Sequence, residues 1–215
     1  PAPVLFVKQP PPPPGPPLEQ RTPGRALCTL GGVVYRDNDL GQYNEMLVAF
    51  MVQHGNRRPR PLVDLIWGRA GAYIHRLPVD QPFTCEAGCA IWGYPKTIEQ
   101  IAISDSENRR TAILTCAGKH VFTLSVPCGG RWSVGERPFD SYSYRDGILR
   151  RTPFVSSGSG VRFRLGGAEI TLGPHPIADE LRSLGLPKSA LISGSIERMR
   201  ARFGAPQVLS GPTGG

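Results

Sequence analysis

The sequence predicts a single α+β domain, a mostly antiparallel closed or nearly closed β-barrel with a few short helices. Its 26 glycines and 23 prolines disfavour long helices. Short segments in which apolar and polar residues alternate recur between turn signals. The 215 residues, 40% of them apolar, are enough for one sizeable core. Because closing a sheet removes its exposed edges, many antiparallel strands with few helices favour a barrel.

The chain divides into an arm, a domain and a tail. Residues 1–25 form a predicted Pro-rich arm, since Pro10 to Pro17 is interrupted only at Gly15 and favours an extended polyproline-II conformation. Such an arm is either a peptide ligand for an aromatic groove or a rigid leader packed on the domain, and we expect the leader. Residues 26–205 form the single domain, and 206–215 a flexible tail with little to bury.

Alternation and turn signals place the individual elements. A helix over Gln81–Trp92 should end near Gly93, because Pro95 disfavours helical geometry at Tyr94. Strands are expected at 26–36, 43–53, 72–79 and 98–104. Two hairpins are expected, one at 111–126 with its turn at 117–119 and one at 161–172 with its turn at Gly166-Gly167. Two further helices are expected, one after Pro176 and one at 189–202, and the second has a core stripe of Ile192, Ile196, Met199 and Phe203.

Charge and cysteine usage exclude several classes of protein. The net charge is +8, but the arginines are scattered, no run reaches five basic residues, and aromatics do not interleave with them. We therefore expect no nucleic-acid partner, although anion attraction into a cleft stays open. No apolar stretch reaches eighteen residues, so no membrane span is expected.

The five cysteines form no C-x-x-C pair and follow no leader sequence, which is typical of a reducing cytoplasm. Cys85 and Cys89 could face a metal from one helix, yet no histidine lies at ligand spacing from them. We expect free thiols and no metal site.

Lysine is rare in this chain, whose default cation is arginine. Only Lys8, Lys96, Lys119 and Lys188 occur among 25 basic residues. A lysine can lose its proton and attack a ketone to form an imine, whereas an arginine cannot. Lys96 follows the apolar and aromatic segment Ile91–Pro95, which could desolvate its amine. The alternative is a lysine that extends into solvent after a helix end.

Two segments resemble the acetoacetate decarboxylase-like family. The stretch from Tyr73 through Gly88–Lys96 is similar to the family's central segment, in which a Tyr-Pro-Lys ending carries the Schiff-base lysine. Leu40–Glu45 resembles the loop whose glutamate points into the active site. With the closing segment from Gly173 to Ile196, the resemblance covers most of 26–205.

The resemblance implies a Schiff-base lyase that acts on a small oxo acid without a cofactor and self-associates into a homo-oligomer. It implies that Lys96 and Glu45 are catalytic, and we expect Tyr94, Trp92 and Tyr43 to line the substrate site. If a β-carboxylate leaves the imine, the enzyme is a decarboxylase; if a proton, hydroxide or aldehyde leaves, it is a dehydratase, hydratase or aldolase-type enzyme. A binding barrel without turnover is the other class.

Three departures from the family bear on decarboxylation. The decarboxylases have a second lysine directly after the Schiff-base lysine, where this chain has Thr97. A further family glutamate falls on Leu30, and the family's N-terminal arginine has no aligned counterpart, with Arg21 and Arg25 as candidates. These departures put decarboxylation of acetoacetate itself in question and leave imine formation untouched.

Overall fold

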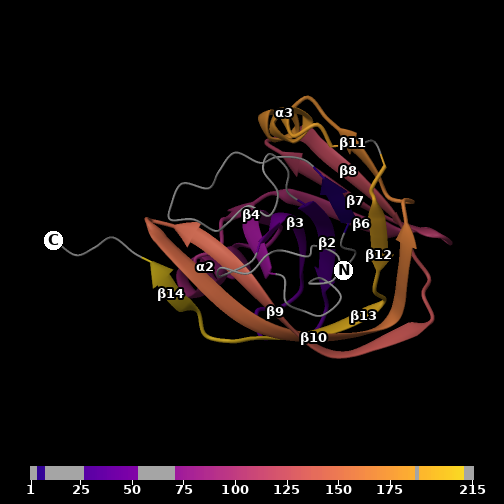
Figure 1. Ribbon diagram of the computed structural model, residues 1–215. Coiled ribbons are helices and arrows are strands. Elements are labelled where there is room, and N and C mark those ends of the chain that lie inside the picture. The colour runs from indigo at the N-terminus through magenta and orange to yellow at the C-terminus, as the bar shows by residue number, and fades with distance from the viewer. Residues whose placement is uncertain (1–3, 8–26, 53–70, 187–188, 211–215) are drawn as a thin grey trace.

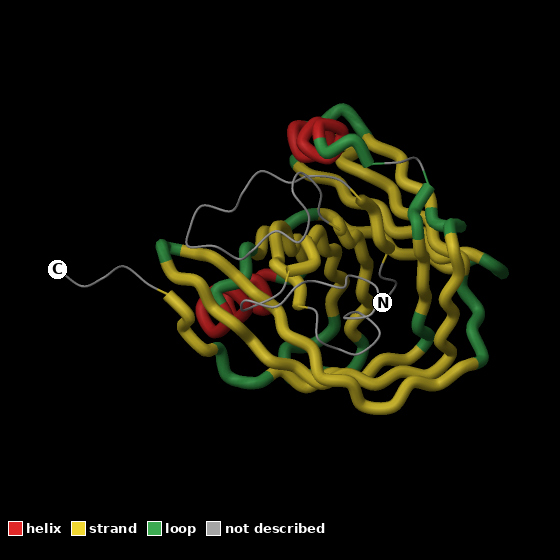
Figure 2. The backbone as a smooth tube through the Cα atoms, in the orientation of Figure 1, coloured by secondary structure: helices red, strands yellow, loops and turns green. Residues whose placement is uncertain are grey.

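The computed structural model describes residues 4–7, 27–52, 71–186 and 189–210, so Arg21, Arg25 and most of the predicted arm lie outside the described residues. Strands dominate these ranges (Figure 2). The two described helices are α2 (Pro82–Trp92) and α3 (Pro176–Ser183). The prediction of a strand-rich α+β fold with few helices is confirmed.

A ten-stranded sheet forms the body of the molecule and curls strongly, with β9 and β10 sweeping along its lower side (Figure 1). Its main path runs β12-β1-β2-β3-β4-β9-β10-β13, and β5 and β14 join at β4 and β10. The bounds are β1 Val4–Val7, β2 Leu27–Tyr35, β3 Tyr43–Val52, β4 Gly71–Val79, β5 Lys96–Ile98, β9 Trp132–Arg145, β10 Ile148–Leu165, β12 Ile192–Ser195, β13 Arg198–Phe203 and β14 Gln207–Ser210.

Complete closure into a barrel is not confirmed. The strand β12 pairs with both β10 and β1, which brings the two ends of the curl together, but only two residue pairs join β1 to β12. The ladder between β4 and β9 is parallel and covers three residue pairs. The sheet is therefore a curled half-barrel with short ladders at its joins.

A second, four-stranded sheet covers the outer, convex face of the curl, in the order β11-β8-β7-β6. Its strands are β6 Gln100–Asp105, β7 Arg109–Cys116, β8 Lys119–Pro127 and β11 Glu169–Leu172. The largest hydrophobic core lies between the two sheets and α3, and it includes Leu30, Met46, Phe50, Phe122, Leu124 and Leu181. Burial of these side chains holds the second sheet against the first.

The strand β3 separates this outer core from the inside of the curl. Its even-numbered residues Met46 and Val48 pack in the outer core, whereas Ala49 and Met51 pack in a smaller inner core with Ile74 of β4. Because successive strand residues point to opposite faces, Tyr43 and Glu45 share the inner face with Ala49 and Met51.

The predicted hairpin at 161–172 is wrong in its pairing, although both segments are strands. The segment 161–165 is the end of β10, which pairs with β9 and β12, and β11 pairs with β8 in the other sheet. Gly166 and Gly167 have φ values of 64° and 85°. They carry the chain from one sheet to the other instead of folding it back.

The predicted helix at 189–202 is also wrong, because this segment forms β12 and β13. The apolar spacing that suggested a helix coincides with strand alternation, in which Arg198 and Arg200 are exposed and Met199 is partly buried. Phe203 is 41% exposed and is not a core residue. Within the predicted arm and tail, Val4–Val7 and Gln207–Ser210 form β1 and β14.

Candidate active site

The strand β5 places Lys96 at the inner face of the curl. The helix α2 ends at Gly93, whose φ of 64° is the left-handed conformation that a helix-ending glycine adopts easily. After Tyr94 and Pro95 the chain enters β5, which pairs in parallel with β4 and sets Lys96 beside Leu77. Leu77 packs in the inner core, so Lys96 faces inward with it.

A buried ion pair joins the two residues predicted to be catalytic. Lys96 Nζ lies 2.8 Å from Glu45 Oε2, and the two side chains are only 5% and 9% exposed. Glu45 comes from β3 and Lys96 from β5, with β4 between them in the sheet. Buried charges of this kind are stable only when they are paired and hydrogen-bonded.

Two further side chains surround the amine. Lys96 Nζ donates a hydrogen bond to Thr84 Oγ1 at 3.3 Å, and Thr84 on α2 is fully buried. The amine also lies 5.2 Å from the centroid of the Tyr43 ring. Burial, followed by repulsion from the Glu45 carboxylate, raises the pKa of Tyr43 to about 12, so this phenol stays neutral at physiological pH.

Tyr35 holds the other oxygen of the carboxylate. Its hydroxyl donates to Glu45 Oε1 at 3.1 Å, and its ring stacks on Tyr43 with centroids 4.2 Å apart. The two tyrosines are direct cross-strand partners in the β2–β3 ladder. Burial, followed by the nearby carboxylate, raises the pKa of Tyr35 well above its usual range. The Tyr35 phenol therefore stays protonated at physiological pH and remains a hydrogen-bond donor to Glu45.

Gly88 makes room for the lysine. It lies on α2 one turn after Thr84, and a Cβ added there would come within 2.6 Å of both Lys96 Cδ and Lys96 Cε. The lysine stem therefore packs directly against the helix backbone. Thr84, Gly88 and Tyr35 were not predicted from the sequence to lie at this site. The spacing of four between Thr84 and Gly88, which puts both on one helix face just before Tyr-Pro-Lys, is a signal for the first two.

Trp92 and Tyr94 anchor the segment that leads to Lys96. The Tyr94 hydroxyl shares a 2.7 Å hydrogen bond with Ser141 of β9, and Trp92 Nε1 donates to the Gly204 carbonyl at 3.2 Å. The two rings stack on each other with centroids 6.1 Å apart. In the described residues neither side chain contacts the amine, so of the three predicted substrate-binding residues only Tyr43 lies directly against it.

The departures at Thr97 and Leu30 carry less weight in the structure than in the sequence. Thr97 is exposed and, next to Lys96 along a strand, points to the opposite face of the sheet. A lysine at that position would not stand beside the Lys96 amine. Leu30 is fully buried in the outer core and likewise faces away from Glu45.

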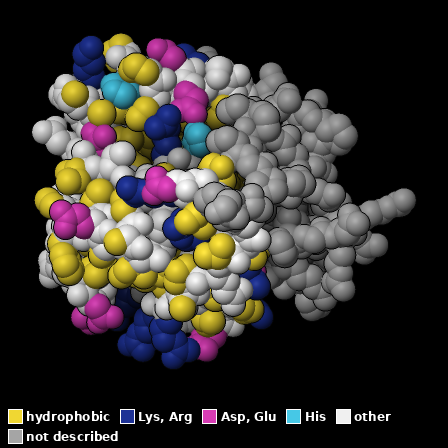
Figure 3. Space-filling view, turned by 90° about the vertical axis from the view of Figure 1, so that its left-hand side faces the viewer, with side chains coloured by type: hydrophobic (Ala, Val, Ile, Leu, Met, Phe, Trp, Pro, Cys, Tyr) yellow, Lys and Arg dark blue, Asp and Glu magenta, His cyan; other side chains and the backbone are white. Residues whose placement is uncertain are grey.

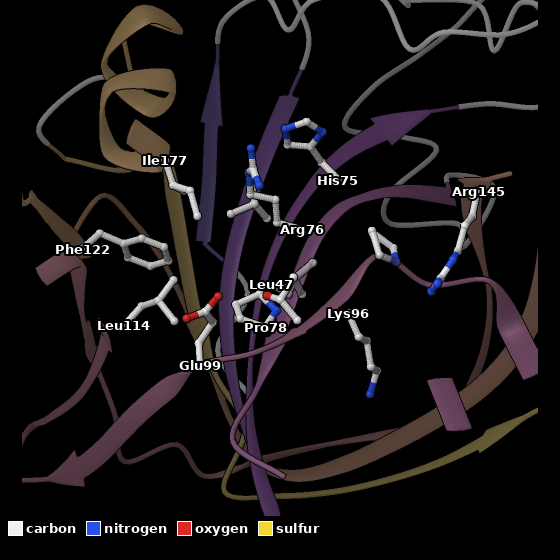
Figure 4. Close-up of a pocket in the computed structure, with 13 residues that line it drawn as sticks. Leu47, His75, Arg76, Pro78, Lys96, Glu99, Leu114, Phe122, Arg145 and Ile177 are labelled. Atoms are coloured by element: carbon white, nitrogen blue, oxygen red, sulfur yellow. The ribbon is translucent and has the colours of Figure 1, made fainter. Parts of the chain in front are cut away.

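A pocket of about 450 Å³ is lined in part by Lys96 and its neighbours Pro95 and Thr97. Leu114, Phe122 and Ile177 line its apolar side, and Glu99 and Arg145 line its polar part. Figure 4 shows the Lys96 side chain turning away from these apolar residues. Neither Glu45, Thr84 nor Tyr43 lines the pocket, so we do not assign the Lys96 chemistry to it.

A bulge in β4 directs His75 and Arg76, which both line this pocket, toward Glu180 of α3. Val48 pairs with Arg76 and Ala49 with Ile74, so His75 is an extra residue. His75 Nε2 lies 2.6 Å from Glu180 Oε1, and Arg76 binds Glu180 Oε2 through two nitrogens at 2.9 and 2.7 Å. Basic, acidic and histidine side chains lie close together in the upper part of the face seen in Figure 3.

Within the described ranges, no group of three or more His, Cys, Asp and Glu side chains is placed to hold a metal ion. The described cysteines, Cys28, Cys85, Cys89, Cys116 and Cys128, are all free thiols. Neither described helix has the length and apolarity that crossing a bilayer requires.

Comparison with known structures supports the fold. Acetoacetate decarboxylase from Legionella pneumophila superposes with a TM-score of 0.68 at 14% identity, over 99% of this chain and 86% of that one. An acetoacetate decarboxylase-like enzyme from Sphingomonas wittichii RW1 gives 0.56 at 15% identity, over 97% and 90%. The enduracididine biosynthesis enzyme MppR, complexed with the condensation product of pyruvate and imidazole 4-carboxaldehyde, gives 0.54 at 18% identity, over 97% and 87%.

A search of the curated proteins finds no match. The sequence profile described as acetoacetate decarboxylase (ADC), however, matches residues 14–212, which is most of the chain. The profile match and the shared fold agree with the family resemblance of the Tyr94–Lys96 and Leu40–Glu45 segments. The chain belongs to the acetoacetate decarboxylase family.

Proposed function

We propose that this protein is a Schiff-base-forming lyase that acts on a small oxo acid, with decarboxylation of the acetoacetate type as its reaction. Lys96 is the nucleophile and Glu45 exchanges protons with it and with the substrate. The observation that carries the proposal is the buried pair of Lys96 Nζ and Glu45 Oε2 at 2.8 Å. A general base at hydrogen-bonding distance can take the proton that an ammonium must lose before it attacks a carbonyl.

The proposed steps use groups of the chain, the substrate and solvent water. Glu45 takes a proton from Lys96, and the neutral amine adds to the ketone carbon. Glu45 returns this proton to the leaving hydroxyl, and loss of water gives a protonated imine, which draws the electron pair of the breaking carbon–carboxylate bond as carbon dioxide leaves. Glu45 then takes one proton from solvent and passes it to the enamine carbon, and hydrolysis of the iminium by water releases the ketone and restores Lys96 as its ammonium.

An aldolase-type reaction is the second candidate, and hydratase or dehydratase chemistry starts from the same imine. MppR, whose fold this chain shares, was crystallised with a condensation product of pyruvate and an aldehyde. In that case the imine of an oxo acid loses a proton instead of carbon dioxide, and the enamine attacks an aldehyde carbon. Glu45 would again be the proton acceptor.

Trapping with borohydride tests the Schiff base. The protein is incubated with acetoacetate, pyruvate and related oxo acids, reduced, digested and mapped by mass spectrometry. We expect an adduct on Lys96 in the wild type and none in Lys96→Arg, which keeps the positive charge but cannot form an imine. Lys119→Arg, an exposed lysine at the start of β8, is the matched control and should trap normally.

The same incubations separate the reactions. Carbon dioxide release with acetoacetate supports the decarboxylase, and a pyruvate adduct that couples to an added aldehyde supports the aldolase-type enzyme. A Lys96 adduct without any product would indicate a ligand-binding protein that forms the Schiff base but does not catalyse a reaction. No Lys96 adduct with any oxo acid would overturn the enzyme proposal.

A further inference from the structure

Among the described residues, the Lys96 amine has two hydrogen-bond acceptors, and they come from different parts of the fold. Glu45 Oε2 lies 2.8 Å away on β3, and Thr84 Oγ1 lies 3.3 Å away on α2. A neutral amine has two N–H groups and one lone pair. Once Glu45 has passed the lysine proton on to solvent or to the substrate oxygen, each N–H can be directed to one of these acceptors, which leaves the lone pair free for the substrate carbonyl.

We propose that Thr84 and Tyr35 are positioning residues for the Schiff-base reaction: Thr84 fixes the direction of the Lys96 amine, and Tyr35 fixes the Glu45 carboxylate that serves it. The inference rests on the proposed function and adds two residues that the Tyr-Pro-Lys segment and Glu45 loop do not contain. We call Thr84, Glu45 and Tyr35 the lysine cradle.

The helix α2 holds Thr84 rigidly. Gln81 caps the start of the helix, and its Oε1 accepts a 2.6 Å hydrogen bond from the Thr84 backbone N–H. Thr84 is fully buried, and Gly88 one turn later lets the lysine stem reach its hydroxyl. Preorganised acceptors of this kind cost no rearrangement during reaction.

Tyr35 acts on Glu45 and not on Lys96. Its hydroxyl donates a hydrogen bond to Glu45 Oε1 at 3.1 Å, so Oε2 faces the Lys96 amine. Stacking against Tyr43 fixes the Tyr35 ring. Without this hydrogen bond the carboxylate can rotate, and both the distance and the direction of its contact with Lys96 change.

The test compares Thr84→Val, Thr84→Ser and Tyr35→Phe by two measurements. The first is reductive methylation with formaldehyde and cyanoborohydride, in which the rate at Lys96 is divided by the rate at Lys119 of the same molecules. It needs no oxo acid, so it reports on the cradle even where the proposed substrate class fails. The second is the rate of borohydride-trapped adduct formation at saturating oxo acid.

We expect Thr84→Val to lower both Lys96 rates about ten- to hundredfold, the effect of losing a hydrogen bond to a charged or reacting group. Thr84→Ser keeps the hydroxyl and should restore them to within about twofold of wild type, which a purely structural role would not predict. Tyr35→Phe should lower them about tenfold through the carboxylate.

Matched controls use the same changes elsewhere. Thr29→Val removes a buried hydroxyl that has no hydrogen-bond partner among the described residues, and Tyr144→Phe removes a phenol of β9. Both should label and trap as the wild type does. If Thr84→Val and Thr84→Ser lose reactivity equally, or if Thr84→Val keeps it, the positioning role is overturned. Normal methylation ratios with no oxo-acid adduct would sink the proposed function alone.

Discussion

At the scale of single residues, the pairing of Lys96 with Glu45 fixes what each can do. An ammonium buried to 5% exposure without a partner would be costly, and the same holds for a carboxylate buried to 9%. Removing one partner leaves the other uncompensated, which costs about 3–5 kcal/mol in buried pairs. Burying this pair is therefore tolerated only where other groups stabilise it, and the hydrogen bonds of Thr84 to Lys96 and of Tyr35 to Glu45 do so.

Replacing Glu45 with Gln tests its role as proton acceptor. The amide keeps the size of the side chain but cannot take a proton from Lys96, so the rate of adduct formation should fall by about 10²-fold or more. The measurement is borohydride trapping with mass spectrometry, after circular dichroism has shown that the variant is folded. Glu99→Gln, which changes a carboxylate that lines the pocket of about 450 Å³, is the control and should form the adduct at the wild-type rate.

Gly88→Ala tests the close packing of the lysine on α2. The new Cβ would meet the lysine stem at 2.6 Å, so Lys96 must move away from Thr84 and Glu45. We expect trapping to fall about tenfold or more, together with a net loss of about 1 kcal/mol in the free energy of unfolding, as overpacking outweighs the better helix propensity of alanine. Gly135→Ala, where a Cβ meets nothing within 4 Å, should change neither. Unchanged trapping in Gly88→Ala would contradict the packing.

The sequence pointed to Lys96 and Glu45 because residue type and family resemblance act at the level of short segments. It did not point to Thr84 or Tyr35, because their roles depend on a helix lying over the inner face of a sheet and on the β2–β3 register. Local spacing puts Thr84 and Gly88 on one face of the helix, but it does not say that this face lies over the Lys96 amine. The orientation of Thr97 also depends on the strand assignment, because alternation along β5 turns its side chain away from the amine.

At the scale of elements, β4 contacts α3 through His75 and Arg76, which both bind Glu180. Burial acts to raise the pKa of Glu180, but the hydrogen bonds and charges of His75 and Arg76 outweigh it and hold that pKa below the usual 4.5. A carboxyl with a lowered folded-state pKa stabilises the fold above its unfolded-state value. That stability is lost as the pH falls through the lowered value.

Glu180→Gln should therefore lower the free energy of unfolding by about 1 kcal/mol at neutral pH, a value for a partly buried, bidentate pair. The difference from wild type should shrink as the pH falls through the lowered folded-state pKa of Glu180, below which both proteins lack the charge. Urea unfolding at several pH values measures it. Glu169→Gln, whose carboxylate is 69% exposed and 3.7 Å from Arg109, should show little difference at any pH. A constant gap between Glu180→Gln and wild type would exclude the electrostatic explanation.

Elements with strong local signals were predicted well. The bounds of β2, β3, β4 and α2 agree with alternation, a left-handed glycine and a proline after the helix. The errors at 161–172 and 189–202 have different causes: at 161–172 local alternation does not say which sheet a strand joins, and at 189–202 the apolar spacing fits a helix as well as a strand. The Gly166-Gly167 pair suits both a hairpin turn and a crossing between sheets, and only the tertiary fold decides between them.

At the scale of the whole molecule, the curled sheet has the largest hydrophobic core on one face and the candidate active site on the other. Its convex face packs against the four-stranded sheet and α3 in the largest core, and its concave face holds Lys96, Glu45 and the smaller inner core. Strand alternation makes this separation possible, because each of β2, β3 and β4 gives one set of side chains to each side. Changes in the outer core should therefore weaken the fold without altering the site.

Leu124→Ala is the corresponding experiment. Leu124 lies on β8 with 1% exposure, so truncation should lower the free energy of unfolding by about 2–5 kcal/mol through lost burial and a residual cavity. Urea unfolding measures this loss, with Leu165→Ala, at 82% exposure, as the control that should stay close to wild type. The methylation ratio of Lys96 to Lys119, measured in folded protein well below the unfolding midpoint, should be unchanged in both variants. A ratio that falls with stability would mean that the outer core positions the lysine, and the separation of the two faces would not hold.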